Sequence, residues 1–133
     1  MFLRELNNTQ KNGFWKLANK LVFIDGKIEK SEKRMLEEYN FELGLAELEI
    51  KDYPDDVEKI LSDMELDKRL KKIVMFELIG LAFSDDYYDQ SEKELLIDIQ
   101  NKIGLSETDV TELGKFVNEV LALYSKIGDF INE

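Results

Sequence analysis

The chain repeats itself at an offset of sixty residues. When the sequence is shifted by this amount, residues 21–45 align with residues 81–105 without a gap, and nine of the twenty-five aligned positions are identical. Chance pairing at this composition would give roughly one or two identities. Two copies are too few for a solenoid, which needs about three repeats to bury its faces. We therefore expect a duplication, in which two units pack against each other around a pseudo-two-fold axis.

The spacing of apolar residues sets the fold class. Apolar residues recur at steps of three and four almost throughout, which is the helical period, and Pro54 is the only proline. The pattern predicts an all-α protein, a single compact helical domain over residues 1–133 with about six or seven helices. The first helix-loop-helix repeat covers about residues 14–53, and the second covers about residues 68–124.

Local signals predict where several helices begin and end. Gly44 and Gly104 each follow an apolar stripe and suit the left-handed residue that ends a helix. Ser31 and Ser91 suit the N-cap, and residues 45–54 suit a short helix or turn. The last helix presents an apolar stripe made of Val110, Leu113, Val117, Val120, Leu121 and Tyr124.

Each repeat carries an acidic loop, at residues 25–32 and 85–92. Carboxylate oxygens suit a hard cation such as Ca²⁺ or Mg²⁺. The loop is not an EF-hand, because its shared acids lie at positions one, five and eight rather than at alternate positions. We expect either a weak divalent-cation site or, as the alternative, side-chain capping and solvated charge. The candidate metal ligands are Asp25, Glu29, Glu32, Asp85, Asp86, Asp89 and Glu92.

The loop acids differ in how well local structure explains them. Glu32 and Glu92 fall in the first turn of a helix, where the dipole stabilises a negative charge by roughly 0.3–1 kcal/mol. Asp25 and Asp85 fall at the end of the preceding helix, where the dipole disfavours an anion. A cation, a hydrogen bond from a loop N–H group or a lysine such as Lys27 has to compensate them.

Composition excludes several functions. The net charge of −11 disfavours nucleic acids and anionic lipids, so the expected partner is a neutral, basic or cationic protein. Cysteine and histidine are both absent, and no P-loop, dinucleotide turn or nucleophile–base pair is present, which predicts a protein without enzymatic activity. No stretch predicts membrane insertion or secretion, so we expect a cytoplasmic location. The only basic cluster is Lys68, Arg69, Lys71 and Lys72, which either offsets nearby acids or meets an acidic partner.

The paired loops resemble those of the TerB-like family of tellurite-resistance proteins. The resemblance rests on Asp25-Gly26, Glu32 and Gly44-Leu45 in the first copy, and on Asp85, Glu92 and Gly104-Leu105 in the second, where Asp86 replaces the loop glycine. It implies an all-helical bacterial or phage-associated protein with a role in tellurite resistance or stress responses. Two hypotheses follow. The chain is a non-enzymatic TerB-like domain that binds a divalent cation, or it is a helical protein-interaction adaptor with no metal site.

Overall fold

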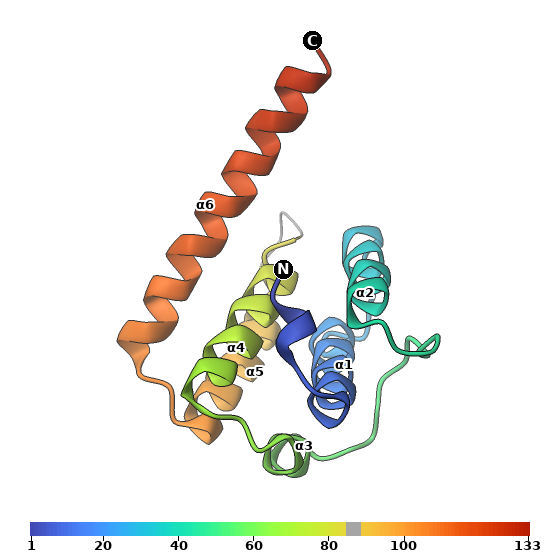
Figure 1. Ribbon diagram of the computed structural model, residues 1–133, viewed down its shortest axis with the longest axis vertical. Helices are drawn as coiled ribbons and strands as arrows, with labels where there is room; N and C mark the ends of the chain where they lie inside the picture. Colours follow the sequence, from blue (N-terminus) through green and yellow to red (C-terminus); the bar gives the residue numbers. More distant parts are fainter. Residues whose placement is uncertain (85–88) are drawn as a thin grey trace.

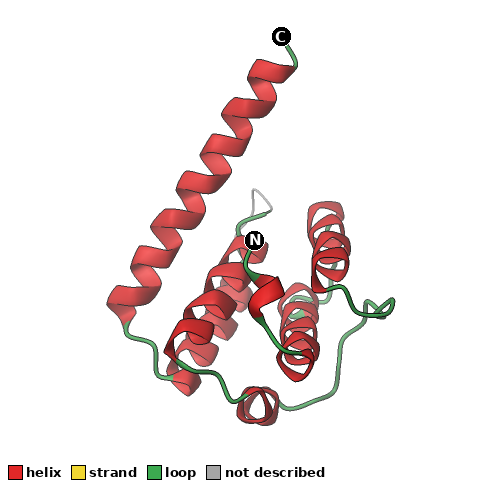
Figure 2. Cartoon of the chain, in the orientation of Figure 1, coloured by secondary structure: helices red, strands yellow, loops and turns green. Residues whose placement is uncertain are grey.

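The structure is a computed structural model that describes residues 1–84 and 89–133. These residues form six α-helices and one short 3₁₀ helix, and they contain no strand (Figures 1 and 2). The predicted all-α class is confirmed. None of the helices in the described part is both long and apolar enough to cross a membrane. In chain order the elements are η1 (Leu3–Glu5), α1 (Asn8–Phe23), α2 (Lys30–Leu43), α3 (Val57–Met64), α4 (Lys68–Ala82), α5 (Gln90–Ile103) and α6 (Glu107–Ile131).

The helix boundaries follow the sixty-residue offset. Helix α4 begins sixty residues after α1, and both the start and the end of α5 lie sixty residues after those of α2. Gly44 and Gly104 end α2 and α5 with φ angles of 66° and 75°, a conformation that favours glycine. The predicted helix ends are therefore correct at both glycines, while the pseudo-two-fold relation between the units stays a prediction.

Helices α1 and α4 lie at the centre of the bundle. Helix α1 contacts α2, α3, α4 and α5, and α4 contacts α2, α5, α6 and η1. Burial of their apolar faces supplies the main stabilisation, at roughly 1.5–3 kcal/mol for each large side chain. The fully buried side chains of this central pair include Phe14, Leu17, Leu21, Val74, Leu78 and Leu81.

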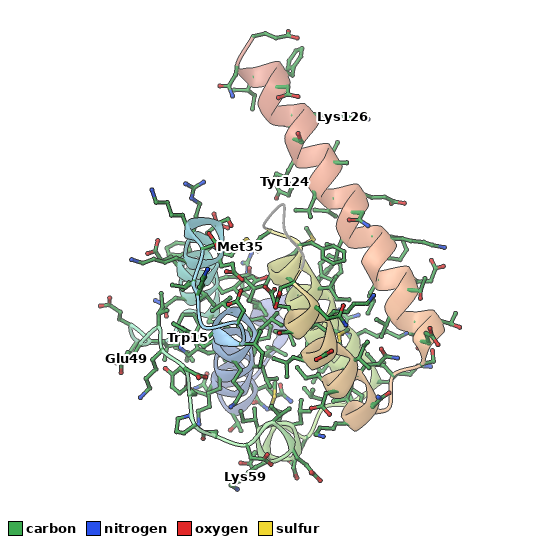
Figure 3. The ribbon with its side chains drawn as sticks, turned by 180° about the vertical axis from the view of Figure 1, so that it is seen from behind. Trp15, Met35, Glu49, Lys59, Tyr124 and Lys126 are labelled. Atoms are coloured by element: carbon green, nitrogen blue, oxygen red, sulfur yellow. The ribbon has the colours of Figure 1, made fainter. Side chains whose placement is uncertain are left out.

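The connection between α2 and α3 contains no helix over residues 45–56, so the short helix, one of the two predicted forms, does not occur there. Side chains of α1 hold this connection. The buried Asn19 accepts a hydrogen bond from the Lys51 N–H at 3.0 Å, and the Trp15 indole N–H donates to the Glu49 carbonyl at 3.1 Å (Figure 3). The polar end of Trp15 thus finds a partner while its ring stays in the core.

The N-terminus is fixed across two helices. The Met1 ammonium lies 2.9 Å from both Glu42 of α2 and the buried Glu77 of α4. Burial alone would lower the pKa of this ammonium, but its hydrogen bonds with the two carboxylates outweigh burial and raise the pKa. The Met1 ammonium therefore links α2 to α4 through two ion pairs.

Helix α6 departs from the expected packing. It continues to Ile131, beyond the predicted end of the second repeat near residue 124, and its C-terminal half projects past the other helices (Figure 1). Its first half packs against α4, and Val117 is the one residue of α6 that is fully buried. Tyr124, the last residue of the predicted stripe, is 66% exposed.

Candidate metal centre

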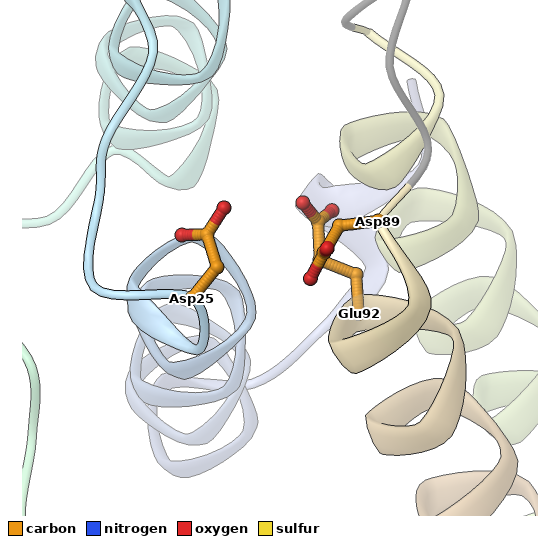
Figure 4. A group of neighbouring side chains, drawn as sticks. All are labelled: Asp25, Asp89 and Glu92. Carbon is orange, nitrogen blue, oxygen red and sulfur yellow. The ribbon is translucent and has the colours of Figure 1, made fainter.

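Three carboxylates from the two acidic loops meet at one place. Asp25 follows α1, while Asp89 and Glu92 begin α5, and a carboxylate oxygen from each lies within 4.8 Å of the others (Figure 4). Helices α1 and α5 are in contact, which brings the end of one beside the start of the other. The sequence left open whether the loops form one site or two. The described residues place acids of both loops in one group.

Asp89 owes its position to helix capping. It is the N-cap of α5, and its Oδ2 accepts a hydrogen bond from the Ser91 N–H at 3.0 Å. The predicted N-cap at Ser91 is therefore wrong by two residues: Asp89 and Ser91 are both favoured cap residues, and α5 begins after the first of them. The same carboxylate therefore caps α5 and lies in the group with Asp25.

The first repeat shows the same shift of the N-cap. Helix α2 is capped at Glu29 rather than at Ser31, and Glu32 Oε1 accepts a hydrogen bond from the Glu29 N–H at 3.0 Å. In this type of cap, the side chain three residues after the cap residue accepts a hydrogen bond from the backbone N–H of the cap residue, and Glu32 lies three residues after Glu29. The prediction that Glu32 and Glu92 occupy first turns is confirmed.

Asp25 is held by its own loop. Its Oδ1 accepts a hydrogen bond from the Lys27 N–H at 3.0 Å, and Gly26 between them has a φ angle of 80°. This is one of the three compensations that the sequence left open for an acid at a helix end. The turn uses one oxygen of the exposed carboxylate and fixes the direction of the side chain.

Glu92 is the buried member of the group, with 5% of its surface exposed. A carboxylate that leaves water needs polar or charged partners, because burial disfavours its ionised form. Like charges this close repel one another, and a cation bound among the three carboxylates would relieve that repulsion.

The structure separates the other candidate ligands from this group. Glu29 and Glu32 serve the start of α2, and neither belongs to the cluster of Asp25 with the α5 acids. Asp85 and Asp86, the remaining predicted ligands, lie outside the described residues.

Carboxylate oxygens suit a hard divalent cation, and Ca²⁺ accepts irregular oxygen geometry more readily than Mg²⁺, which demands near-ideal octahedral geometry and loses water reluctantly. The three oxygens lie within 4.8 Å of one another, close enough to approach a single ion. Three protein carboxylates leave several coordination positions for water, which indicates weak binding.

In comparisons with known proteins, no family model, no curated protein and no solved structure matches the chain.

Proposed function

We propose that the chain is a non-enzymatic TerB-like domain that binds a divalent cation through Asp25, Asp89 and Glu92. The observation that carries the proposal is the meeting of acids from two loops that are far apart in the sequence. We place its role in the cytoplasm of a bacterial cell, in a complex that serves tellurite resistance or another stress response. The paired acidic loops support this assignment through their resemblance to the TerB-like family.

Calcium is the ion that we favour. All three ligands are carboxylates, which suit hard cations, and Ca²⁺ tolerates an irregular set of oxygen ligands better than Mg²⁺ does. A bound ion would neutralise most of the charge at the junction of α1 and α5. The small number of protein ligands points to a dissociation constant of roughly 10⁻⁴–10⁻³ M.

Titration with Ca²⁺ and Mg²⁺ tests this function. Isothermal calorimetry is expected to show one Ca²⁺ site per chain, with weaker Mg²⁺ binding. At a Ca²⁺ concentration ten times the dissociation constant, the free energy of unfolding should rise by about 1.4 kcal/mol, which corresponds to a thermal midpoint higher by roughly 3–6 °C.

Two variants locate the site. Asp25→Asn should abolish the calcium response, whereas Asp52→Asn, which removes an exposed acid of the connection between α2 and α3, should retain it. An unchanged midpoint at millimolar Ca²⁺, Mg²⁺ and Mn²⁺ contradicts a cation site. Equal losses in both variants would mean that the response reflects general screening of the acidic surface.

A protein-interaction adaptor without a metal site is the second candidate. It is favoured by the outer face of α2, where the 90% exposed Phe41 lies one helical turn from Glu37 and Glu38. An apolar side chain beside acids fits a basic partner with an apolar contact. A basic protein captured by tagged chain equally in chelator and in calcium, and lost with Phe41→Asp, supports the adaptor over the cation-binding domain.

A further inference from the structure

A groove with a volume of about 680 Å³ lies beside the contact between α4 and the first half of α6. Figure 1 shows the two helices that form its walls. Val117, which is 3% exposed, does not line the groove. The groove lies on the neighbouring flank of α6, where Leu113, Phe116 and Val120 follow one another at steps of three and four. Its volume falls in the range of roughly 300–1,000 Å³ that is typical of small-molecule sites.

Aromatic rings form much of the apolar wall of this groove. Phe2 and Phe76 meet edge to face with ring centroids 5.8 Å apart, and the Phe2 N–H donates a hydrogen bond to the buried Glu77 at 3.1 Å, which fixes this part of the wall. Phe2 and Phe116 are nevertheless 39% and 51% exposed. A ligand with an apolar tail would remove this aromatic surface from water, which favours its binding.

The charge of the groove is opposite to that of the whole chain. The chain carries 29 acids against 18 basic residues, for a net charge of −11. Of the described residues, three cationic side chains and no acid line the groove, and the three are Lys68, Arg69 and Lys72. A cationic lining in an acidic protein is complementary to an anionic ligand.

Two of these cations are available to a ligand. The Arg69 guanidinium already donates to Glu5 Oε1, at 2.6 and 3.1 Å. Lys68 and Lys72 form no ion pair with any acid that the structure describes, and Lys72 is half-buried. A partly buried ammonium without an acidic partner favours a bound anion. Lys68, Lys72 and Phe76 follow one another at steps of four, so one face of α4 carries charge at its start and an apolar ring one turn later.

The volume of the groove suits a slender chain better than a helix of another protein. A helix of three turns, about 10 Å across, occupies roughly 1,300 Å³, which is about twice the volume of the groove. At roughly 30 Å³ for each small group, the share of one water molecule in the liquid, about 20 non-hydrogen atoms fill the groove, and a fatty acid with about 18 carbons has this size. Charge at one end and an apolar remainder match the same ligand.

We propose that this groove binds a long-chain fatty acid, with the carboxylate at Lys68 and Lys72 and the tail against Phe76 and Phe116. The two ammonium groups donate charge-assisted hydrogen bonds to the carboxylate. The order of these residues along α4 sets the direction of the tail, from the start of the helix toward Phe76. The groove shares no residue with the three carboxylates of the candidate metal centre, so the fatty acid binds with or without calcium.

Isothermal calorimetry of the full chain with dodecanoate tests the proposal. Dodecanoate serves as the probe because it stays monomeric at concentrations where longer fatty acids aggregate, and chelator in the buffer prevents calcium soaps. We expect one site per chain with a dissociation constant of roughly 10–100 µM. Octanoate has the same carboxylate and a tail shorter by four methylene groups, so it should bind at least about tenfold more weakly. Equal affinities, or no saturable binding of dodecanoate below about 1 mM, would overturn the proposal.

Two adjacent lysines test the charged end of the groove. Lys72→Met keeps an apolar stem of similar length and removes the ammonium, so it should weaken dodecanoate binding at least about fivefold. Lys71 is also half-buried and belongs to the same basic cluster, but it lines a different pocket, beside Lys102. Lys71→Met is therefore the matched control and should bind dodecanoate with unchanged affinity. Equal losses in the two variants would mean that only the overall charge matters and would contradict the site.

Two exposed phenylalanines of α6 test the apolar end. Phe116→Ser should weaken dodecanoate binding about tenfold, whereas Phe130→Ser, at the 74% exposed ring that does not line the groove, should leave it unchanged. The reverse order would place the ligand on the projecting end of α6 and overturn the proposal.

Other occupants of the groove predict different results. If free dodecanoate does not bind, co-sedimentation of the chain with phosphatidylglycerol vesicles would assign the groove to a membrane surface. Binding of a synthetic amphipathic helix of Leu and Glu in place of dodecanoate would assign it to an acidic protein partner. Either result would overturn the fatty-acid site.

Discussion

The Tyr39 hydroxyl of α2 donates a hydrogen bond to the backbone carbonyl of Glu77 in α4, at 2.8 Å. Burial raises the pKa of this phenol well above its usual value, and the charges of Glu77, Glu42 and Glu38 raise it further. The phenol is therefore neutral in the folded protein at a pH where the unfolded chain has begun to ionise.

Alkaline pH should destabilise the protein through Tyr39. The unfolded phenol titrates near pH 10, so this contribution to stability is complete below pH 10 and declines as pH rises toward the higher folded pKa. Urea unfolding between pH 8 and 11 should show a smaller decline for Tyr39→Phe than for the unaltered protein. Tyr39→Phe should also lower stability by about 1 kcal/mol at pH 8, because the Glu77 carbonyl loses its partner. Equal declines would contradict the role of this phenol.

The Asp25→Asn variant should respond with opposite signs in chelator and in calcium. Asparagine retains the oxygen that accepts the Lys27 N–H, but it removes one charge from the carboxylate group. In chelator we expect stability to rise by about 0.5–1 kcal/mol, because repulsion falls. In saturating Ca²⁺ the variant should be less stable than the unaltered protein. Thermal melts in both buffers measure the change of sign. A rise in stability in both buffers would mean that the substitution only relieves repulsion and that Asp25 does not bind calcium.

Removing the cap at Asp89 should have two separable effects. Asp89→Ala loses the hydrogen bond to the Ser91 N–H and one candidate ligand, so it should cost about 1 kcal/mol and also abolish the calcium response. Asp67 caps α4 in the same manner, at 2.8 Å from the Leu70 N–H, but lies outside the group. Asp67→Ala should therefore lose similar stability and still respond to calcium. Chemical unfolding with and without Ca²⁺ separates the two variants.

Two glycines inside helices should respond differently to alanine. A Cβ at Gly13 in α1 would lie 2.6 Å from Cγ of the buried Met64, so Gly13→Ala should destabilise the protein by about 1–2 kcal/mol despite the better helix propensity. At Gly80 in α4 the nearest atom, the Tyr39 hydroxyl oxygen, is 3.9 Å away. Gly80→Ala should raise stability by up to about 1 kcal/mol. Urea midpoints compare the two, and equal effects would argue against close packing of α1 on Met64.

The sequence predicted those parts of the fold that depend on local chemistry. Glycine alone tolerates the left-handed conformation without strain, so the ends of α2 and α5 could be predicted at Gly44 and Gly104. The starts of these helices were harder to predict, because each offers two candidate caps, Glu29 or Ser31 in α2 and Asp89 or Ser91 in α5. In both repeats the helix begins after the first of the two candidates.

The candidate site required tertiary information. A helical period shows which face of α5 is apolar, but it does not show that the end of α1 lies against the start of α5. The burial of Glu92 could not be predicted either, because the helix dipole already explains an acid in a first helical turn without any tertiary contact. In α6 the apolar stripe was visible in the sequence, but the position where α4 stops covering it was not.

The distance along the chain between Asp25 and Asp89 bears on the order of folding events. These residues are separated by 64 positions, 89 minus 25, so their carboxylates cannot meet in a nascent chain until α5 has formed and docked against α1. Contacts of such separation require closure of a long loop and form late when local helices assemble first. A cation bound by these carboxylates would therefore lower the unfolding rate and leave the folding rate almost unchanged.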